Sequence, residues 1–245
     1  MKPKLLMAGA VLVVAALVLY FGADFFLGSV VARGVNRFGP KITQTKVTLA
    51  GARISPLSGS GTLTGLFVGN PRGWASEKAF YFGKVHIEVA PGSLFGDHIV
   101  VNEVLIDKPE FVYETRVVSS NIGDLLQNIR GTAGSDKADQ ATTRSGKPIK
   151  FEIRHFFLTD GRVTLGVGPA AVTFPMPPVE LTDVGRSEGG ITSSQLAAAV
   201  MHSISGSVVQ ASTQAAGKIG STLGAAAGHG LKELFGGKQQ GDSKK

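Results

Sequence analysis

Hydrophobic and polar residues alternate along most of the chain, which is the pattern of strands in a sheet with one apolar face. The alternation is clearest in residues 41–118 and 148–185. It predicts a mainly β protein with flanking helices, built on a mostly antiparallel sheet that has one apolar face. The residues expected on the apolar face are Leu66, Val68, Phe80, Phe82, Val85, Ile87, Val89, Val101, Val104, Ile106, Phe151, Ile153, Val163 and Leu165.

Two turn signals fall within the second alternating region. Thr159-Asp160-Gly161 separates two alternating runs. It predicts a β-hairpin, because Asp-Gly supplies the positive φ that tight hairpin turns need. The segment 170–185 carries three prolines, which cannot donate hydrogen bonds to a ladder. We therefore expect that segment at an edge of the sheet or between strands.

Three segments have the apolar spacing of helices. Residues 24–38 predict a juxtamembrane helix that ends before Gly39-Pro40, and residues 119–130 predict a short capped helix. Residues 192–235 carry apolar side chains at steps of three or four in an Ala/Gly-rich background, which predicts an amphipathic helix. Its glycines weaken it in isolation, so it needs the sheet or a membrane to lie against.

The remaining segments are polar. Residues 131–147 contain no apolar side chain larger than that of alanine, which predicts a flexible loop, and residues 236–245 form a basic tail. The formal net charge of +7 is concentrated at the two ends of the chain, and the body is nearly neutral. Basic ends that flank apolar segments favour a membrane surface as partner and disfavour nucleic acid.

Residues 5–23 form an uncharged run of 19 residues. As a helix this run is about 30 Å long, the thickness of a bilayer core, so we predict one transmembrane anchor. A cleaved signal peptide is the alternative, although its apolar core is usually only about 7–15 residues long. The residues expected at the membrane interface are Tyr20, Phe21, Phe25 and Phe26, with Trp74 as a further candidate.

The orientation of this span is set by few charges. The basic residues before and after it balance, so the free amino group and Asp24 decide. They favour residues 1–4 in the cytoplasm and the body outside it.

The sequence offers little catalytic chemistry. It has no cysteine, which excludes disulfides, thiolate metal sites and cysteine nucleophiles. Its five histidines are dispersed, and no hydrolase, metalloprotease or phosphate-loop motif is present. We therefore predict a protein that is not an enzyme, with no catalytic residues, no metal and no cofactor.

One turn stands out at the end of an alternating strand. In "GTLTGLFVGNPRGW", residues 61–74, the Asn-Pro-Arg-Gly sequence predicts a β-turn. Trp74 follows it and is the only tryptophan of the chain. We expect its ring to be an apolar plug at the end of the sheet, or alternatively a contact with lipid or the membrane interface.

Several stretches follow one another in the order of a known family. They are "ISPLSGSGTLTGLFVGNPRGW", "AFYFGKVHIEVAPGSLFGDHIVVNEVLIDKPEFVYE" and "SNIGDLLQNI". With the N-terminal run, they resemble the N-terminal region of the bacterial AsmA-like family over residues 1–185. The resemblance implies a single-pass protein of the bacterial inner membrane with a periplasmic body. The sheet that it implies is curved, and gutter-like or half of a sandwich. It also implies phospholipid binding or transport, in outer-membrane biogenesis and envelope homeostasis.

Two functions from different classes remain open at this point. One is the lipid-binding or lipid-transfer function that the resemblance implies, with phospholipid as partner. The other is a non-catalytic structural or protein-interaction domain of the envelope, including a LEA-like sandwich, which also carries a "V-x-N-P" strand end. The two differ in what covers the apolar face of the sheet, a guest lipid or the helices of the chain itself.

Overall fold

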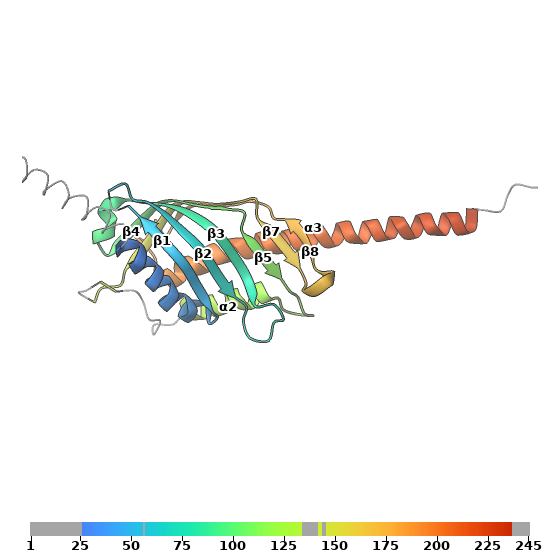
Figure 1. Cartoon of the computed structure of the whole chain (residues 1–245), viewed down its shortest axis with the longest axis horizontal. Helices are drawn as coiled ribbons and strands as arrows, with labels where there is room; N and C mark the ends of the chain where they lie inside the picture. The colour runs from blue at the N-terminus through green and yellow to red at the C-terminus, as the bar shows by residue number, and fades with distance from the viewer. Residues whose placement is uncertain (1–25, 56, 134–141, 144–145, 237–245) are drawn as a thin grey trace, which may run out of the picture.

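The computed structural model describes residues 26–55, 57–133, 142–143 and 146–236, and describes residues 219–236 by their backbone (Figure 1). Residues 26–43 are helical. The other helices are η1 (Pro91–Phe95), α2 (Asn121–Ala133), η2 (Gly168–Ala170) and α3 (Ser193–Gly236). The strands are β1 (Val47–Ile54), β2 (Ser60–Gly69), β3 (Lys78–Val89), β4 (His98–Asp107), β5 (Glu110–Tyr113), β6 (Lys150–Thr159), β7 (Arg162–Leu165), β8 (Val172–Pro175) and β9 (Val179–Val184).

These strands form one open, mixed sheet, which confirms the prediction of a mainly β protein. Strands β1, β2 and β3 are antiparallel neighbours, and β3 then pairs with both β4 and β5. The pairs β4–β6 and β5–β7 are parallel, because helix α2 carries the chain back across the sheet between them. Strands β8 and β9 form the far edge, where the proline-rich segment was expected.

The hairpin predicted at Thr159-Asp160-Gly161 is wrong. Strands β6 and β7 do not pair with each other: β6 lies between β4 and β9, and β7 lies between β5 and β8. Asp160 has the expected positive φ of 53°, but the chain bends there and continues in the same direction. Strands β4 and β5 join in the same way at Lys108, whose φ is also 53°.

The bends line up in one row across the whole sheet. The strand registers on either side place Ala50, Gly65, Gly83, Lys108, Asp160 and Pro177 opposite one another, and we call this row the crease. The ladder continues across it, since the Lys108 amide donates to the Thr159 carbonyl at 3.0 Å and the Arg162 amide donates to the Pro109 carbonyl at 2.9 Å.

The crease changes which residues of each strand face the core. Phe80 and Phe82 precede it on β3, and Val85 follows it, yet all three side chains belong to one buried cluster. A regular strand would turn Phe82 and Val85 to opposite faces. The bend at Gly83 therefore explains why residues of both parities lie on the apolar face, as the sequence pattern predicted.

The helix of residues 26–43 covers the free edge of β1. The Asn36 side chain accepts a hydrogen bond from the Leu49 amide at 2.6 Å and donates to the Leu49 carbonyl at 3.3 Å. It therefore occupies backbone groups that an edge strand would leave open. The helix was expected to end before Gly39-Pro40 and instead continues to residue 43, where the Asn128 amide donates to the Thr43 carbonyl.

Helices α2 and α3 pack on one face of the sheet. Helix α2 extends three residues beyond its predicted end, so residues 131–133 are helical and not the start of a loop. Helix α3 begins at a capping box, in which Thr192 and Gln195 exchange side-chain-to-amide hydrogen bonds. Its first part lies against the sheet, and its second part projects well beyond the body (Figure 1).

Several predictions fall outside the described residues. These are the anchor at 5–23, the interface residues Tyr20, Phe21 and Phe25, most of the loop 131–147 and the tail from residue 237. Among the helices that the structure does describe, none is both long enough and apolar enough to cross a bilayer.

Candidate functional site

The predicted apolar face is the inner face of the sheet. Most of its residues are buried or packed against the same core, and Phe151 is half-buried near its margin. The buried ones are Val68, Phe80, Phe82, Val85, Val89, Ile106, Ile153 and Val163. Those packed against the core and partly buried are Leu66, Ile87, Val101, Val104 and Leu165.

The chain's own helices cover this face. Helix α2 buries Ile122, Leu125, Leu126 and Ile129 against it. Helix α3 buries Met201, Ile204, Val208, Ala211 and Ala215. Three phenylalanine rings of the sheet stack beneath these helices, with centroids 4.9–5.8 Å apart. The described structure is therefore a closed core and holds no open gutter.

A polar network joins the turn that follows β2 to the segment after β5 and to the first turn of α2. We call it the clasp, and it consists of Asn70, Gly73, Trp74, Ser76, Glu114, Arg116, Asn121 and Asp124. At its centre, the fully buried Asn121 amide donates to the Asn70 side-chain oxygen at 2.8 Å and to the Val112 carbonyl at 2.7 Å. Its oxygen accepts from the Glu114 amide at 2.9 Å. All the polar atoms of this asparagine are therefore satisfied.

The Glu114 carboxylate is the charged member of the clasp. It accepts hydrogen bonds from the Ala75 and Ser76 amides, both at 2.9 Å, and from the Ser76 hydroxyl at 2.6 Å. Burial by itself would raise the pKa of Glu114, but these hydrogen bonds and the positive charge of Arg116 outweigh it and hold the pKa below its ordinary value. The carboxylate therefore stays ionised at neutral pH and fixes the loop.

Trp74 lies at the end of the sheet, as predicted, and polar partners hold it there. Its indole nitrogen donates to the Asp124 carboxylate at 2.9 Å, which ties the loop to the first turn of α2. The Arg116 guanidinium lies 4.4 Å from the ring centroid and also donates to the Gly73 carbonyl. The Trp74 ring is thus held by a hydrogen bond at its nitrogen and by a cation–π contact on one face.

The clasp also presents a tight turn to solvent. The Arg116 amide donates to the Ser119 carbonyl at 2.8 Å, which closes a four-residue turn. Val117 and Val118 form its tip, and their side chains are fully exposed. Turn tips usually carry Gly, Asn, Asp or Pro, so two exposed valines are unusual there.

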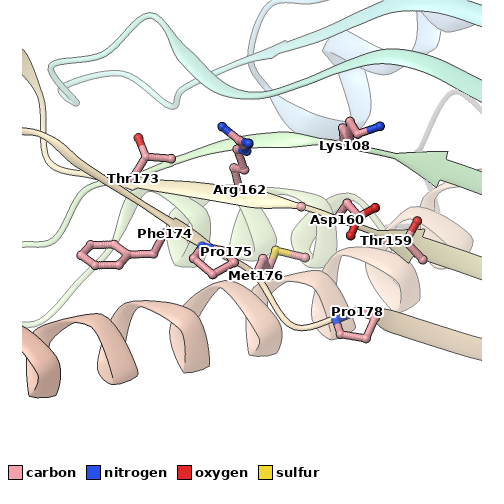
Figure 2. Close-up of a pocket in the computed structure, with 10 residues that line it drawn as sticks. Lys108, Thr159, Asp160, Arg162, Thr173, Phe174, Pro175, Met176 and Pro178 are labelled. Carbon is pink, nitrogen blue, oxygen red and sulfur yellow. The ribbon is translucent and has the colours of Figure 1, made fainter.

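A shallow depression of about 620 Å³ lies on the crease (Figure 2). Lys108, Asp160 and Arg162 line one side of it, and the buried Met176 lies on the side of α3. Lys108 pairs with Asp107 at 3.1 Å. These groups are spread along exposed backbone, so they do not converge on a reacting atom.

Another group of charged side chains lies on β4 and β6. The buried Glu152 lies 3.5 Å from the His98 imidazole and 3.5 Å from the Arg154 guanidinium. Across the described residues, no three histidine or acidic side chains come together as a metal site would require. The described side chains thus present no arrangement with an evident catalytic role.

The other end of the sheet carries exposed apolar side chains. Leu57 lies in the β1–β2 turn and is 75% exposed, and Phe95 ends η1 and is 84% exposed. Phe26, the first described residue, is 61% exposed and lies at the same end, since Gly28 of the same helix packs on the Ala52 carbonyl near the end of β1. We call this the loop end, and we call the end that carries the clasp the clasp end. Phe26 and Trp74, which we listed together as interface candidates, lie at opposite ends.

Comparison with known proteins adds no relative: no family model, curated protein or solved structure matches the chain. The resemblance to the AsmA-like family therefore stays a prediction.

The sequence alone did not predict which residues bind the turn at Asn70 and Trp74. Asn70 and Trp74 were visible as a turn, but Glu114 and Asn121 lie 44 and 51 residues from Asn70. The exposed residues Leu57 and Phe95 had a detectable signal. Both are large apolar residues inside "SPLSGS" and "GSLFGD", segments whose other residues are typical of turns.

Proposed function

We propose that this protein is a non-catalytic, membrane-anchored structural or interaction module of the bacterial envelope. The observation that carries the proposal is the closure of the apolar sheet face by α2 and α3. A carrier needs apolar surface that is free for a guest, whereas a structural module uses that surface for its own core. The projecting part of α3 gives such a module a long arm with which to reach other envelope components.

The membrane anchor and the periplasmic body in this proposal come from the sequence. The uncharged run at 5–23 ends three residues before Phe26, where the described body begins. The balance of charges around the run favours a cytoplasmic N-terminus.

Lipid binding or transfer of the AsmA-like type is the second candidate. The observation that favours it is the composition of helix α3, which covers part of the apolar sheet face. Helix α3 contacts the core with small residues such as Ala211 and Ala215, and it contains glycines at 206 and 217. Such a helix is held in place by packing more than by its own propensity, so a guest acyl chain that displaced it would open the apolar face.

Two neighbouring valines on α3 test whether the core is closed. Val208 is completely buried and Val209 is 42% exposed. For Val208→Asp in the full-length protein we expect a loss of about 3 kcal/mol or more in unfolding free energy, because the carboxylate would be buried without a partner. For Val209→Asp we expect a change within about 0.5 kcal/mol. Thermal unfolding followed by circular dichroism in mild detergent measures both.

Lipid analysis separates the two candidates. The structural proposal predicts that full-length protein, extracted gently from membranes, carries no stoichiometric phospholipid by native mass spectrometry. If stoichiometric lipid is found, and if Val208→Asp releases it without unfolding the sheet, then α3 is a removable cover and the carrier function replaces the structural one.

A further inference from the structure

Hydrogen bonds hold the described residues of the two loops at the loop end, although each loop exposes a large apolar side chain. In the β1–β2 turn, the Ser55 amide donates to the Ser60 carbonyl at 2.9 Å and the Gly59 amide donates to the Ser55 carbonyl at 2.8 Å. In η1, the Ser93 hydroxyl donates to the Ala90 carbonyl at 2.7 Å and accepts from the Val100 amide at 3.0 Å. Leu57 and Phe95 therefore project from fixed backbone and do not fold back onto the body.

These two loops and the start of the first described helix lie together. Gly59 packs so closely on the Val89 carbonyl and Pro91 that a β-carbon would not fit, which joins the β1–β2 turn to η1. Gly28 packs in the same way on the Ala52 carbonyl, which joins the helix of residues 26–43 to the end of β1. The start of the helix of residues 26–43, which begins at Phe26, therefore lies at the end of the sheet that carries both loops.

The length of chain outside the structure limits how far this end can lie from a membrane. The predicted span ends at Ala23, three residues before Phe26. Three residues reach at most about 10 Å even when fully extended. The loop end therefore has to face the bilayer at close range, and the clasp end, on the far side of the sheet, has to point away from it.

We propose that Leu57 and Phe95 dock the loop end on the lipid surface, as two fixed apolar contacts beside the anchor. This inference rests on the membrane anchor of the proposed function. Aromatic and aliphatic side chains are favoured at the boundary between headgroups and acyl chains. Arg53 and Lys150 are exposed at the same end and suit anionic headgroups. The body is thus held upright on the membrane and does not swing on its tether.

The absence of cysteine makes the test direct, because a single introduced cysteine can be labelled alone. Leu57→Cys and Phe95→Cys are prepared in the full-length chain, with Val117→Cys at the clasp end as the matched control. Each carries an environment-sensitive fluorophore, and each protein is reconstituted into vesicles of phosphatidylcholine and phosphatidylglycerol that contain nitroxide-labelled lipid. Circular dichroism checks that each variant is folded.

We expect probes at positions 57 and 95 to shift to the blue and to be quenched by nitroxide lipid roughly twofold or more strongly than the probe at 117. Stronger quenching at positions 57 and 95 is informative because, of the three side chains, that of Val117 is the most exposed in the structure. Exposure alone would therefore predict the strongest quenching at 117. Equal quenching at all three positions would overturn the docking proposal.

Alkaline washing of the same vesicles tests the anchor separately. Protein that resists the wash while its probes at 57 and 95 stay in water keeps the anchor and refutes the docking. Protein that washes off but showed quenching at 57 and 95 beforehand keeps the docking and refutes the anchor. Protein that washes off and shows no quenching refutes both.

Discussion

The two ends of the sheet solve the same problem, the anchoring of loops, in different ways. At the clasp end, buried side chains such as Asn121 and Glu114 bind loop backbone through directional hydrogen bonds. At the loop end, backbone hydrogen bonds and the hydroxyls of Ser58 and Ser93 hold the loops, and the large side chains stay outside. The clasp end thus satisfies its buried polar groups within the chain, although Val117 and Val118 stay exposed there, whereas the loop end leaves the larger side chains of Leu57 and Phe95 exposed.

The energetic consequences differ accordingly. A buried polar network is costly to break, because each group that loses its partner keeps the penalty of its removal from water. Exposed apolar side chains contribute little to folding, so their replacement leaves stability nearly unchanged and alters only what they contact outside. Substitutions at the clasp end should therefore act on stability, and those at the loop end on membrane contact.

The largest effect is expected from Asn121→Leu. The change leaves the Asn70 side-chain oxygen, the Val112 carbonyl and the Glu114 amide without their partner. At about 1–3 kcal/mol for each unsatisfied buried group, we expect a loss of about 3 kcal/mol or more in unfolding free energy. Urea denaturation of the full-length protein in mild detergent measures it.

A surface asparagine provides the control. Asn102 accepts a hydrogen bond from Arg154 at an exposed site on the sheet. Asn102→Ala should change the unfolding free energy by no more than about 0.5 kcal/mol. Equal losses for the two variants would mean that Asn121 does not organise the clasp end.

The sequence predicted the strands better than their connections. Alternation along β3 and β4 identified the apolar face, because burial of one face imposes a period of two. Asp160-Gly161 correctly indicated a positive φ, which Asp160 has, but a residue with positive φ occurs in a hairpin turn and in a crease alike. What separates them is the pairing of β6 with β4 and β9, which depends on residues far away in the chain.

The candidate site was predictable in part for a similar reason. "NPRG" indicates a turn by its own residues, whereas the role of Glu114 depends on the fold that brings it to Ser76. The closure of the apolar face also could not be predicted, because the stripe of α3 is equally suited to a sheet and to a membrane. Ala211 and Ala215 are buried because helix α3 packs against the strands of the sheet.

Glu114 should make the clasp end sensitive to acid. Its folded pKa lies below the ordinary value of 4.5. A carboxylate with a lowered pKa contributes stability that is fully present above the unfolded pKa and is lost as the pH falls through the folded value. We expect the wild-type protein to lose this contribution on acidification below about pH 4.5, as Glu114 is protonated.

Glu114→Gln tests this expectation. The amide nitrogen would face donors, the Ala75 and Ser76 amides, so we expect a loss of about 2 kcal/mol at neutral pH. The variant should also lack the acid destabilisation that protonation of Glu114 causes. The difference in melting temperature between the wild type and Glu114→Gln should therefore narrow as the pH falls. Melting temperatures across the pH range measure this, and a gap that stays constant below pH 4.5 would contradict it.

The smallest loss of stability in the clasp is expected from Arg116→Ala, which removes the cation above the Trp74 ring. Arg116 is exposed, and its guanidinium lies 4.4 Å from the ring centroid. A cation–π contact at an exposed site contributes about 0.5–1 kcal/mol, and Arg116→Ala also removes the hydrogen bond to the Gly73 carbonyl. We therefore expect this variant to lower the unfolding free energy by about 1 kcal/mol. Because Trp74 is the only tryptophan, its emission reports on the clasp alone. We expect the emission to shift in Arg116→Ala and to stay unchanged in Arg154→Ala, a control on β6. An emission spectrum unaffected by Arg116→Ala would show that the ring is held by the Asp124 hydrogen bond and not by the cation.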